Sequence, residues 1–239
     1  MLKATKATID GTLLGPDAIA EVVAMHLHRL GAANAESVTF VADGAPWIWD
    51  RIDSIVRLAG LVDVQIFQVL DCCHAVHHVS LALAAVGFSK EERNPLYREH
   101  RTLLRNGQWR RVVEELSGFQ DAKKPNDDLV TEISYLQRHG EAGHLSYVSF
   151  RARGIPCGSG AIESSIRRVI NLRLKSNAMF WKKENGEAML QIRSHVVPDQ
   201  WDKSMKELSE FRRTIAHDDY QWTPQAMSCK IENSHTTAT

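Results

Sequence analysis

The chain carries two acidic side chains at positions from which carboxylates can act on a phosphate ester. Asp43 follows the run SVTFVA and precedes Gly44, where the backbone can turn away and leave the carboxylate in a cleft. Glu163 falls in the first helical turn after the glycine-rich segment 158–160. Two acids from distant segments can bind Mg²⁺, which prefers a few carboxylate oxygens together with water or phosphate oxygens. Two such ions about 4 Å apart stabilise the attacking and leaving oxygens of a phosphodiester reaction.

Each of these acids also has a simpler explanation. An Asp-Gly pair is a common turn, so Asp43 and Gly44 can serve only to reverse the chain. An acid in the first turn of a helix interacts favourably with the helix dipole, so Glu163 can act only as a capping residue. The sequence leaves both explanations open beside that of a metal site.

The segment around Glu163 is strongly basic, which favours a bound nucleic acid. Between Arg151 and Lys183 there are eight Lys or Arg residues against the single acid Glu163. A helix face that merely meets solvent usually mixes both signs of charge, so this bias disfavours a plain solvated face. On one continuous helix Glu163, Arg167 and Lys175 would share a broad face. The residues expected to face the core are Ile162, Ile166, Val169, Ile170 and Leu174. The expected contacts to DNA phosphates come from Arg167, Arg168, Arg173 and Lys175.

A cluster of metal-binding residue types lies at 71–79, with the sequence DCCHAVHHV. His74 and His78 are four residues apart, as zinc ligands on a helix can be, but no HExxH glutamate and no CxxC pair completes such a site. A buried hydrogen-bonding role for Asp71 and His74, where a strand passes into a helix, is favoured over zinc. Nothing marks the two adjacent cysteines as activated nucleophiles.

The elements that must position these residues alternate between helix and strand in the first third of the chain. Residues 17–30 and 47–60 show the periodicity and boundary residues of helices. Residues 37–44 and 62–71 are β-branched runs typical of buried strands, and each ends in or next to an aspartate. This order predicts an α/β fold with parallel central strands. Residues 5–10 are typical of the end of one further strand.

The remainder of the chain is predicted to be helical. From Cys72 to about Arg153 the helical pattern is broken only at polar, Gly or Asn residues. A turn and a long helix are predicted across 155–175, followed by helices at 182–197 and 200–217. The polar tail from Pro224 predicts disorder.

The composition is that of an ordinary globular protein, with 44% hydrophobic and 24% charged residues in 239. The formal net charge is zero, so nucleic-acid binding has to come from local patches. No apolar run reaches the roughly 20 residues of a membrane span, and we expect no membrane partner. The four cysteines lack the spacing of a disulfide framework, which favours a reducing cytoplasm.

Three segments resemble the insertion-sequence DDE transposases of bacteria, in the branch akin to the Mutator-type transposases. They are FVADGAPWIWDRI at 40–52, VLDCCHAVHHV at 69–79, and GIPCGSGAIESSIRRVINLRLKSNAMFW followed by ENGEAML at 154–190. They occur in the family's order, and the resemblance extends from about Lys6 to Trp201. It implies an RNase H-like catalytic core that binds two Mg²⁺ or Mn²⁺ ions, acts on DNA as a homodimer or larger assembly, and works at the nucleoid of the bacterial cytoplasm.

The resemblance also implies particular site residues. The second catalytic aspartate of the family falls on Asp43 and the final glutamate on Glu163, which would both be metal ligands. The Asp-x-x-His signature of the branch falls on Asp71 and His74.

The implied division of the chain has four parts. Residues 1–75 form a partial RNase H-like α/β core, 76–153 a helical insertion, 154–216 the rest of the core with the acidic helix and C-terminal helices, and 217–239 a disordered tail.

One departure from the family concerns the first catalytic aspartate. Two further strands and a helix must fit between the first two acids, but the helix at 17–30 takes about half of the chain between Asp10 and Asp43. Asp10 therefore corresponds to the end of the third strand. The first strands, the first acid and any N-terminal DNA-binding domain are expected to be missing.

The resulting prediction is the C-terminal portion of a DDE-type transposase, whose intact form cleaves DNA and transfers strands with the help of metal ions. An alternative is a catalytically dead fragment that binds DNA or an intact transposase and acts as a regulator. A third is a metal-binding helical protein that uses the cluster at 71–79.

Overall fold

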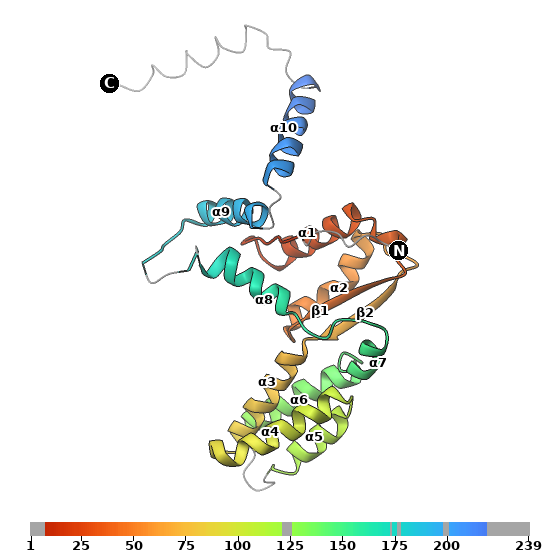
Figure 1. Ribbon diagram of the computed structural model, residues 1–239, viewed down its shortest axis with the longest axis vertical. Coiled ribbons are helices and arrows are strands. Elements are labelled where there is room, and N and C mark those ends of the chain that lie inside the picture. The colour runs from red at the N-terminus through yellow and green to blue at the C-terminus, as the bar shows by residue number, and fades with distance from the viewer. Residues whose placement is uncertain (1–7, 121–125, 173, 176–177, 198–200, 219–239) are drawn as a thin grey trace, which may run out of the picture.

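The protein combines a small parallel sheet with many helices (Figure 1). The computed structural model describes residues 8–120, 126–172, 174–175, 178–197 and 201–218. Within these ranges there is one sheet, in which β1 (Ser37–Ala42) pairs in parallel with β2 (Gln65–Leu70). The register sets Val38 opposite Ile66 and Ala42 opposite Leu70, so the two strand tips meet at the same edge. The predicted α/β class and the parallel pairing are confirmed.

Two helices cover one face of the sheet. These are α1 (Pro16–Arg29) and α2 (Pro46–Leu58), and each begins with a proline, which fits the first turn because no donor is lost there. They pack through small side chains, with Ala20 and Ala24 of α1 buried in one cluster with Ile55 of α2. Small residues allow the two helices to lie close together above β1 and β2.

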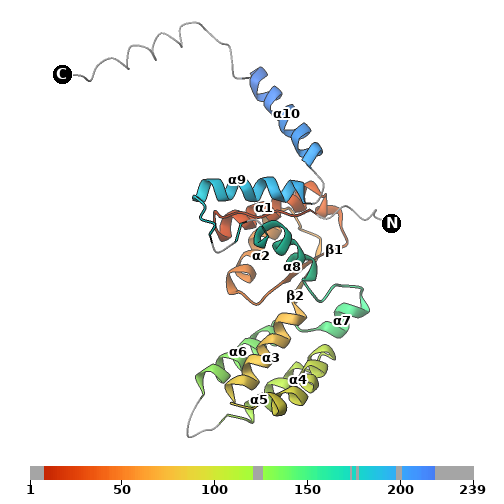
Figure 2. The ribbon, with the colours of Figure 1, turned by 60° about the vertical axis from the view of Figure 1, so that its left-hand side comes forward.

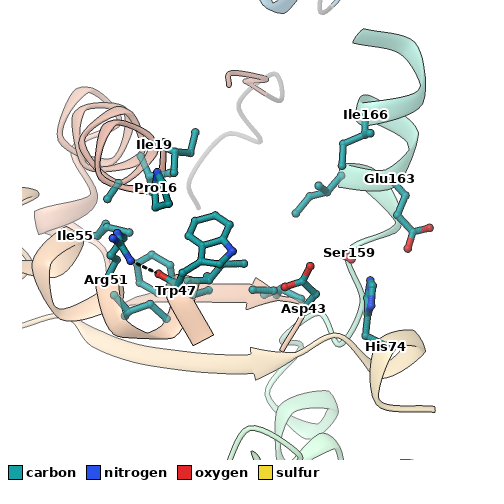
Figure 3. A pocket seen from close by; sticks show the side chains of 18 residues that line it. Pro16, Ile19, Asp43, Trp47, Arg51, Ile55, His74, Ser159, Glu163 and Ile166 are labelled. Atoms are coloured by element: carbon teal, nitrogen blue, oxygen red, sulfur yellow. Dashed lines mark hydrogen bonds between the residues drawn. The ribbon is translucent and has the colours of Figure 1, made fainter. Parts of the chain in front are cut away.

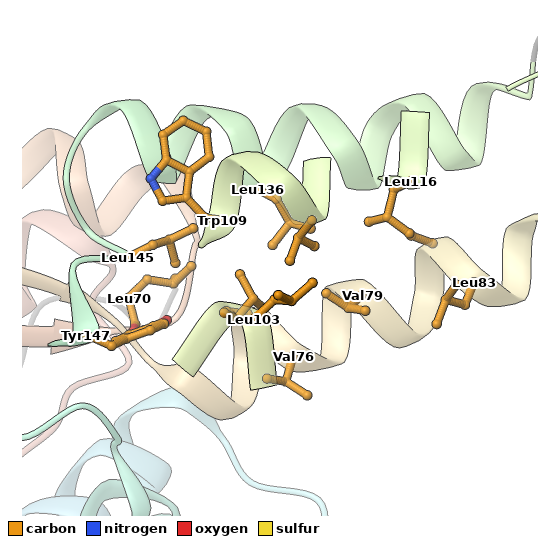
Figure 4. Close-up of a cluster of buried hydrophobic side chains, with 14 of the residues drawn as sticks. Leu70, Val76, Val79, Leu83, Leu103, Trp109, Leu116, Leu136, Leu145 and Tyr147 are labelled. Atoms are coloured by element: carbon orange, nitrogen blue, oxygen red, sulfur yellow. The ribbon is translucent and has the colours of Figure 1, made fainter. Parts of the chain in front are cut away.

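A helical block continues from β2 and packs against the other face. It contains α3 (Cys72–Ala85), α4 (Lys90–Arg105), α5 (Trp109–Ser117), α6 (Asp127–Glu141) and α7 (Tyr147–Ala152). Figure 4 shows its core, in which aliphatic side chains such as Leu83, Leu116 and Leu136 are fully buried. Each such side chain contributes about 1.5–3 kcal/mol by its burial. Tyr147 connects the block to the sheet, because its hydroxyl donates to the Leu70 carbonyl at 3.0 Å.

The last described elements are α8 (Gly160–Ile166), a π-helical turn η2 (Arg167–Asn171), α9 (Lys183–Val196) and α10 (Trp201–Asp218). Of these, α8 and α9 lie near α1, whereas α10 projects away from the rest of the fold (Figure 2). The guanidinium of Arg193 on α9 donates to the carbonyls of Val169 and Arg168, which holds α9 against η2. No helix in the described ranges is long and apolar enough to cross a membrane.

The long helix predicted across 155–175 is wrong in its extent and in its buried face. The α8–η2 segment ends at Asn171, so Lys175 lies beyond it and does not share a helix face with Glu163. Ile162 is 51% and Ile166 42% exposed, whereas Val169 is 3% exposed. The isoleucines stay open because they line a pocket, while α9 covers Val169.

The strand predicted at 5–10 is also not observed in its described part. Residues 8–10 belong to no strand, and the Asp10 carboxylate instead binds the His26 ring at 2.7 Å. The physical reason is pairing, because a strand needs a partner and the described residues place none beside this segment. Residues 5–7 and 219–239 lie outside the described residues, and positions 217–218, predicted to begin the tail, belong to α10.

Candidate active site

The two predicted catalytic acids line one pocket (Figure 3). The pocket has a volume of ≈ 360 Å³ and is bounded by α1, β1, α2 and α8. Most of its lining is apolar, with Ile19, Phe40 and Ile52 among the side chains that form it. Asp43 and Glu163 both line it, together with His74. The fold thus brings two acids that are distant in sequence to one pocket, with the Glu163 carboxylate directed away from Asp43 (Figure 3).

Asp43 is presented by a tight turn at the tip of β1. Its Oδ1 accepts a hydrogen bond from the Ala45 amide at 3.1 Å, and its carbonyl accepts one from the Trp49 indole at 3.1 Å. The side chain is exposed, so the carboxylate keeps free lone pairs for a ligand. The turn explanation and the site explanation are therefore compatible, because the turn is what presents the acid.

Gly44 is required by its surroundings as well as by the turn. A Cβ at this position would overlap the Tyr135 hydroxyl, so only glycine lets α6 approach this closely. The Tyr135 ring stacks on His78 with centroids 3.5 Å apart, and His78 binds Glu132 at 2.5 Å. Burial and the nearby charge of Asp43 raise the pKa of Tyr135, so its phenol remains protonated at neutral pH.

Two histidines and a tryptophan complete the support beneath this turn. The Nδ1 atoms of His139 and His144 are 2.9 Å apart, and the Trp49 ring stacks on His144 with centroids 4.2 Å apart. Burial, helped by His144 and Arg138, lowers the pKa of His139 to about 4. Burial likewise lowers the pKa of His144. Both rings are therefore uncharged at neutral pH, and one can donate to the other.

Asp71 acts as a buried connection between β2, α3 and α8. It is 1% exposed, and its Oδ1 accepts from the amides of Cys73 at 2.6 Å and His74 at 3.1 Å. Its Oδ2 accepts from both the amide and the hydroxyl of Ser159. Burial by itself would raise the pKa of Asp71, but the hydrogen bonds from Ser159, His74 and Cys73 lower it overall. The predicted hydrogen-bonding role of Asp71 is confirmed.

This connection positions Glu163. Ser159 precedes α8, and its carbonyl accepts from the Glu163 amide at 3.2 Å, so Asp71 anchors the start of the helix that carries the acid. The Glu163 side chain is exposed. His74 does not share the buried role of Asp71, because its half-buried ring lines the pocket of the two acids.

The predicted DNA-binding residues fall on and after η2. Arg167 and Arg168 are exposed on the π-helical turn, and Arg168 Nε donates to the Ser164 carbonyl at 3.3 Å. Lys175 is exposed beyond the helix. Arg173 lies outside the described residues. Two positive side chains therefore follow Glu163 on the helical turn that continues α8.

The donor set of the pocket suits a hard cation in chemistry but is small in number. Asp43 and Glu163 provide the carboxylate oxygens that Mg²⁺ and Mn²⁺ prefer. Among the described residues no group of three or more His, Cys, Asp or Glu side chains is arranged to hold a metal ion. The predicted zinc alternative gains no support from the histidines, since His78 binds Glu132 while His74 faces the pocket.

Comparisons with known proteins do not add an identity. No protein family, curated protein sequence or solved structure was found to match the chain.

Sequence reasoning missed the residues that support the site. Tyr135, His139 and His144 lie in the helical block, where no local pattern connects them with Asp43. The Asp-Gly pair was the one available signal, because a glycine after a strand tip can mark the close approach of another element.

Proposed function

We propose that this chain is the C-terminal portion of a DDE-type transposase and contains part of an RNase H-like catalytic core. The observation that carries the proposal is the shared pocket of Asp43 and Glu163, with Arg167 and Arg168 following on the same α8–η2 segment. Paired carboxylates beside cationic side chains suit phosphodiester chemistry, because the acids hold cations and the arginines hold phosphates.

The open edge of β1 supports an incomplete core. The Ala42 carbonyl accepts from the Asp71 amide and the Glu36 carbonyl from the Gln65 amide, so the main chain of these alternate residues points toward β2. The main-chain groups of Thr39 and Val41 must then point to the opposite edge, where no described strand pairs. A strand added there would pair with β1 and bring a third acid to the tips of the strands. That arrangement is the RNase H-like core of the proposal.

In the proposed site Asp43 and Glu163 would hold Mg²⁺ or Mn²⁺. When bound, such an ion supplies an activated water and neutralises charge on the phosphate. The side chains of the protein then have separate tasks. Asp71 holds α8 in place through its hydrogen bonds with Ser159. The side chains that bind DNA phosphates are Arg167, Arg168 and Lys175. The apolar lining of the pocket limits access of water. Assembly on DNA as a homodimer or larger complex, at the bacterial nucleoid, is part of the proposal.

Mn²⁺ binding tests this proposal directly. The electron paramagnetic resonance signal of free Mn²⁺ falls as the ion binds to the full chain. We expect Asp43→Asn and Glu163→Gln each to reduce the bound fraction, because each removes one anionic oxygen ligand. Asp50→Asn is the matched control, because Asp50 is exposed on α2 and does not line the pocket. Equal binding by all three variants would refute the metal site and with it the transposase proposal.

The same open edge favours a second candidate function. A chain with an unpaired parallel edge and an apolar pocket beside it can bind the matching part of an intact transposase and act as its inhibitor. In this case binding of DNA or of the transposase would survive Glu163→Ala, whereas Mn²⁺ binding would not be needed.

A further inference from the structure

A second pocket adjoins the one that contains the two acids. It has a volume of ≈ 460 Å³, and its walls include Arg101 and Arg105 of α4, Arg151 of α7 and Cys157. The two pockets share two walls. In the segment 71–74, His74 lines the acidic pocket and Cys72 lines the second pocket. In the segment 157–159, Ser159 lines the acidic pocket and Cys157 lines the second pocket.

The charge of the side chains that line this second pocket is positive, and the Asp71 carboxylate lies behind its wall, next to Gly158. No Asp or Glu side chain lines it, and the structure shows no ion pair for any of its three arginines within the described residues. Burial raises the pKa of Cys72 and of Cys157, so these thiols stay uncharged at neutral pH and do not offset the guanidinium groups. The three arginines are exposed, so solvent screens part of their mutual repulsion, and a bound anion would reduce what is left of it.

The arginines are arranged in a way that suits an extended anion. Tyr97, Arg101 and Arg105 are spaced four residues apart on α4, so they lie on one face of the helix in successive turns. The Arg151 guanidinium donates to the Arg105 carbonyl, which holds it at the end of this row. The amides at the start of α3 are already occupied, because Cys72 donates to Cys157 and Cys73 to Asp71. The guanidinium groups therefore provide the free donors.

We propose that the pocket formed by Arg101, Arg105 and Arg151 binds backbone phosphate of a nucleic-acid strand that continues into the acidic pocket. Arginine presents a planar fork that matches phosphate oxygens, and Tyr97 adds a ring on which a base can stack. A strand whose phosphodiester lies at Asp43 and Glu163 would reach this pocket by passing over the segments 71–74 and 157–159 that separate the two. The inference takes its nucleic-acid ligand from the proposed function and rests on it in that respect.

Binding of a fluorescein-labelled single-stranded oligonucleotide to the full chain tests this assignment. The measurement is fluorescence anisotropy in EDTA over a range of salt concentrations, so that metal binding does not contribute. We expect Arg101→Ala/Arg105→Ala to raise Kd about tenfold and to lower the slope of log K against log salt by about 0.7 for each phosphate that the variant no longer neutralises. The matched control is Arg93→Ala/Arg98→Ala, which removes the same charge from α4 outside the pocket.

Other outcomes of this experiment overturn the assignment. An equal loss in both double variants would show unspecific attraction by charge, and no loss in either would exclude the pocket. A second arm uses inorganic phosphate and thermal unfolding. Phosphate could raise the Tm of the unmodified chain but not that of Arg101→Ala/Arg105→Ala, while the two proteins bind the oligonucleotide equally. In that case the pocket holds free phosphate and the nucleic-acid assignment is wrong. Failure of Mn²⁺ binding leaves these readouts unaffected, so the two proposals fail separately.

Discussion

Gly44 has a structural task that its position in a turn does not reveal. Asp-Gly turns tolerate other residues when the second position faces solvent, but here the second position is buried under the Tyr135 hydroxyl. The same turn is held from α2 by the Trp49 indole, which donates to the Asp43 carbonyl. The position of the Asp43 carboxylate therefore depends on side chains from two helices outside the turn itself.

The buried pair of His139 and His144 makes stability depend on pH. The pKa of His139 is lowered from 6.5 to about 4 in the folded state, so the unfolded chain takes up the proton first as the pH falls. As the pH is lowered from about 6.5 to about 4, the free energy of unfolding should therefore decrease, by at most about 1.4 kcal/mol per pH unit for this residue. Urea unfolding at about pH 7 and about pH 5 measures the difference.

The control for this prediction is His139→Gln, which keeps an uncharged hydrogen-bonding side chain. Its loss of stability between the two pH values should be smaller than that of the unmodified chain, and His144 accounts for part of what is left. The same pH dependence in both proteins would show that His139 takes up its proton freely in the folded state.

Among the helices and strands, the junction of β2, α3 and α8 determines where Glu163 lies. The Asp71 carboxylate caps α3 and also accepts hydrogen bonds from the amide and the hydroxyl of Ser159. α8 is short, with seven residues, and none of its side chains is buried. Because the helix has so little packing of its own, this junction and the contact of α9 with η2 must hold it.

Ser159→Ala tests the junction. It leaves the buried Asp71 carboxylate with one donor fewer, and we expect it to lower the free energy of unfolding by about 1–3 kcal/mol, measured by denaturant titration. Ser165→Ala is the matched control on the same helix, because its exposed hydroxyl donates only to the Ala161 carbonyl at 2.7 Å. The control should change stability by less than about 0.5 kcal/mol. Equal effects of the two substitutions would mean that Asp71 does not anchor α8 through Ser159.

Taken as a whole, the described fold exposes a sheet edge that natural proteins usually cover. Parallel sheets are commonly buried on both faces and extend over more than two strands. Here β1 has no fully buried residue, whereas Val69 and Leu70 of β2 are 0% exposed. Phe40, Val41 and Ala42 of β1 also line the acidic pocket, so a strand added at this edge would lie next to that pocket.

Paired proline substitutions test whether the edge is open in solution. The amide of Phe40 points toward β2 and that of Thr39 points away. Relative to Ala at the same position, we expect Phe40→Pro to cost about 3 kcal/mol and Thr39→Pro less than about 1 kcal/mol in the free energy of unfolding. The Ala variants control for the loss of each side chain. A large cost for Thr39→Pro would show that this edge is paired, for example by a second copy of the chain.

Local signals in the sequence were enough to predict most of the elements. The β-branched runs before Asp43 and Asp71 predicted two parallel strands, and Pro16 and the apolar periodicity predicted the helices, because these signals act over a few neighbouring residues. The same signals predicted that Asp43 would stand at a strand tip. The helix that carries Glu163 was predicted to extend to Lys175, but the helical segment ends at Asn171. Its length depends on tertiary contacts, which bury Val169 and leave Ile162 and Ile166 exposed.

How these elements combine could be learned only from the folded chain. The fold places Asp43 and Glu163 in one pocket, uses both oxygens of Asp71 to anchor α3 and α8, and puts Tyr135 over Gly44. It also sets three arginines of α4 and α7 around a second pocket that shares its walls with the first. These contacts join residues that are distant along the chain. Their energies depend on packing and burial in the folded state, which no short stretch of sequence contains.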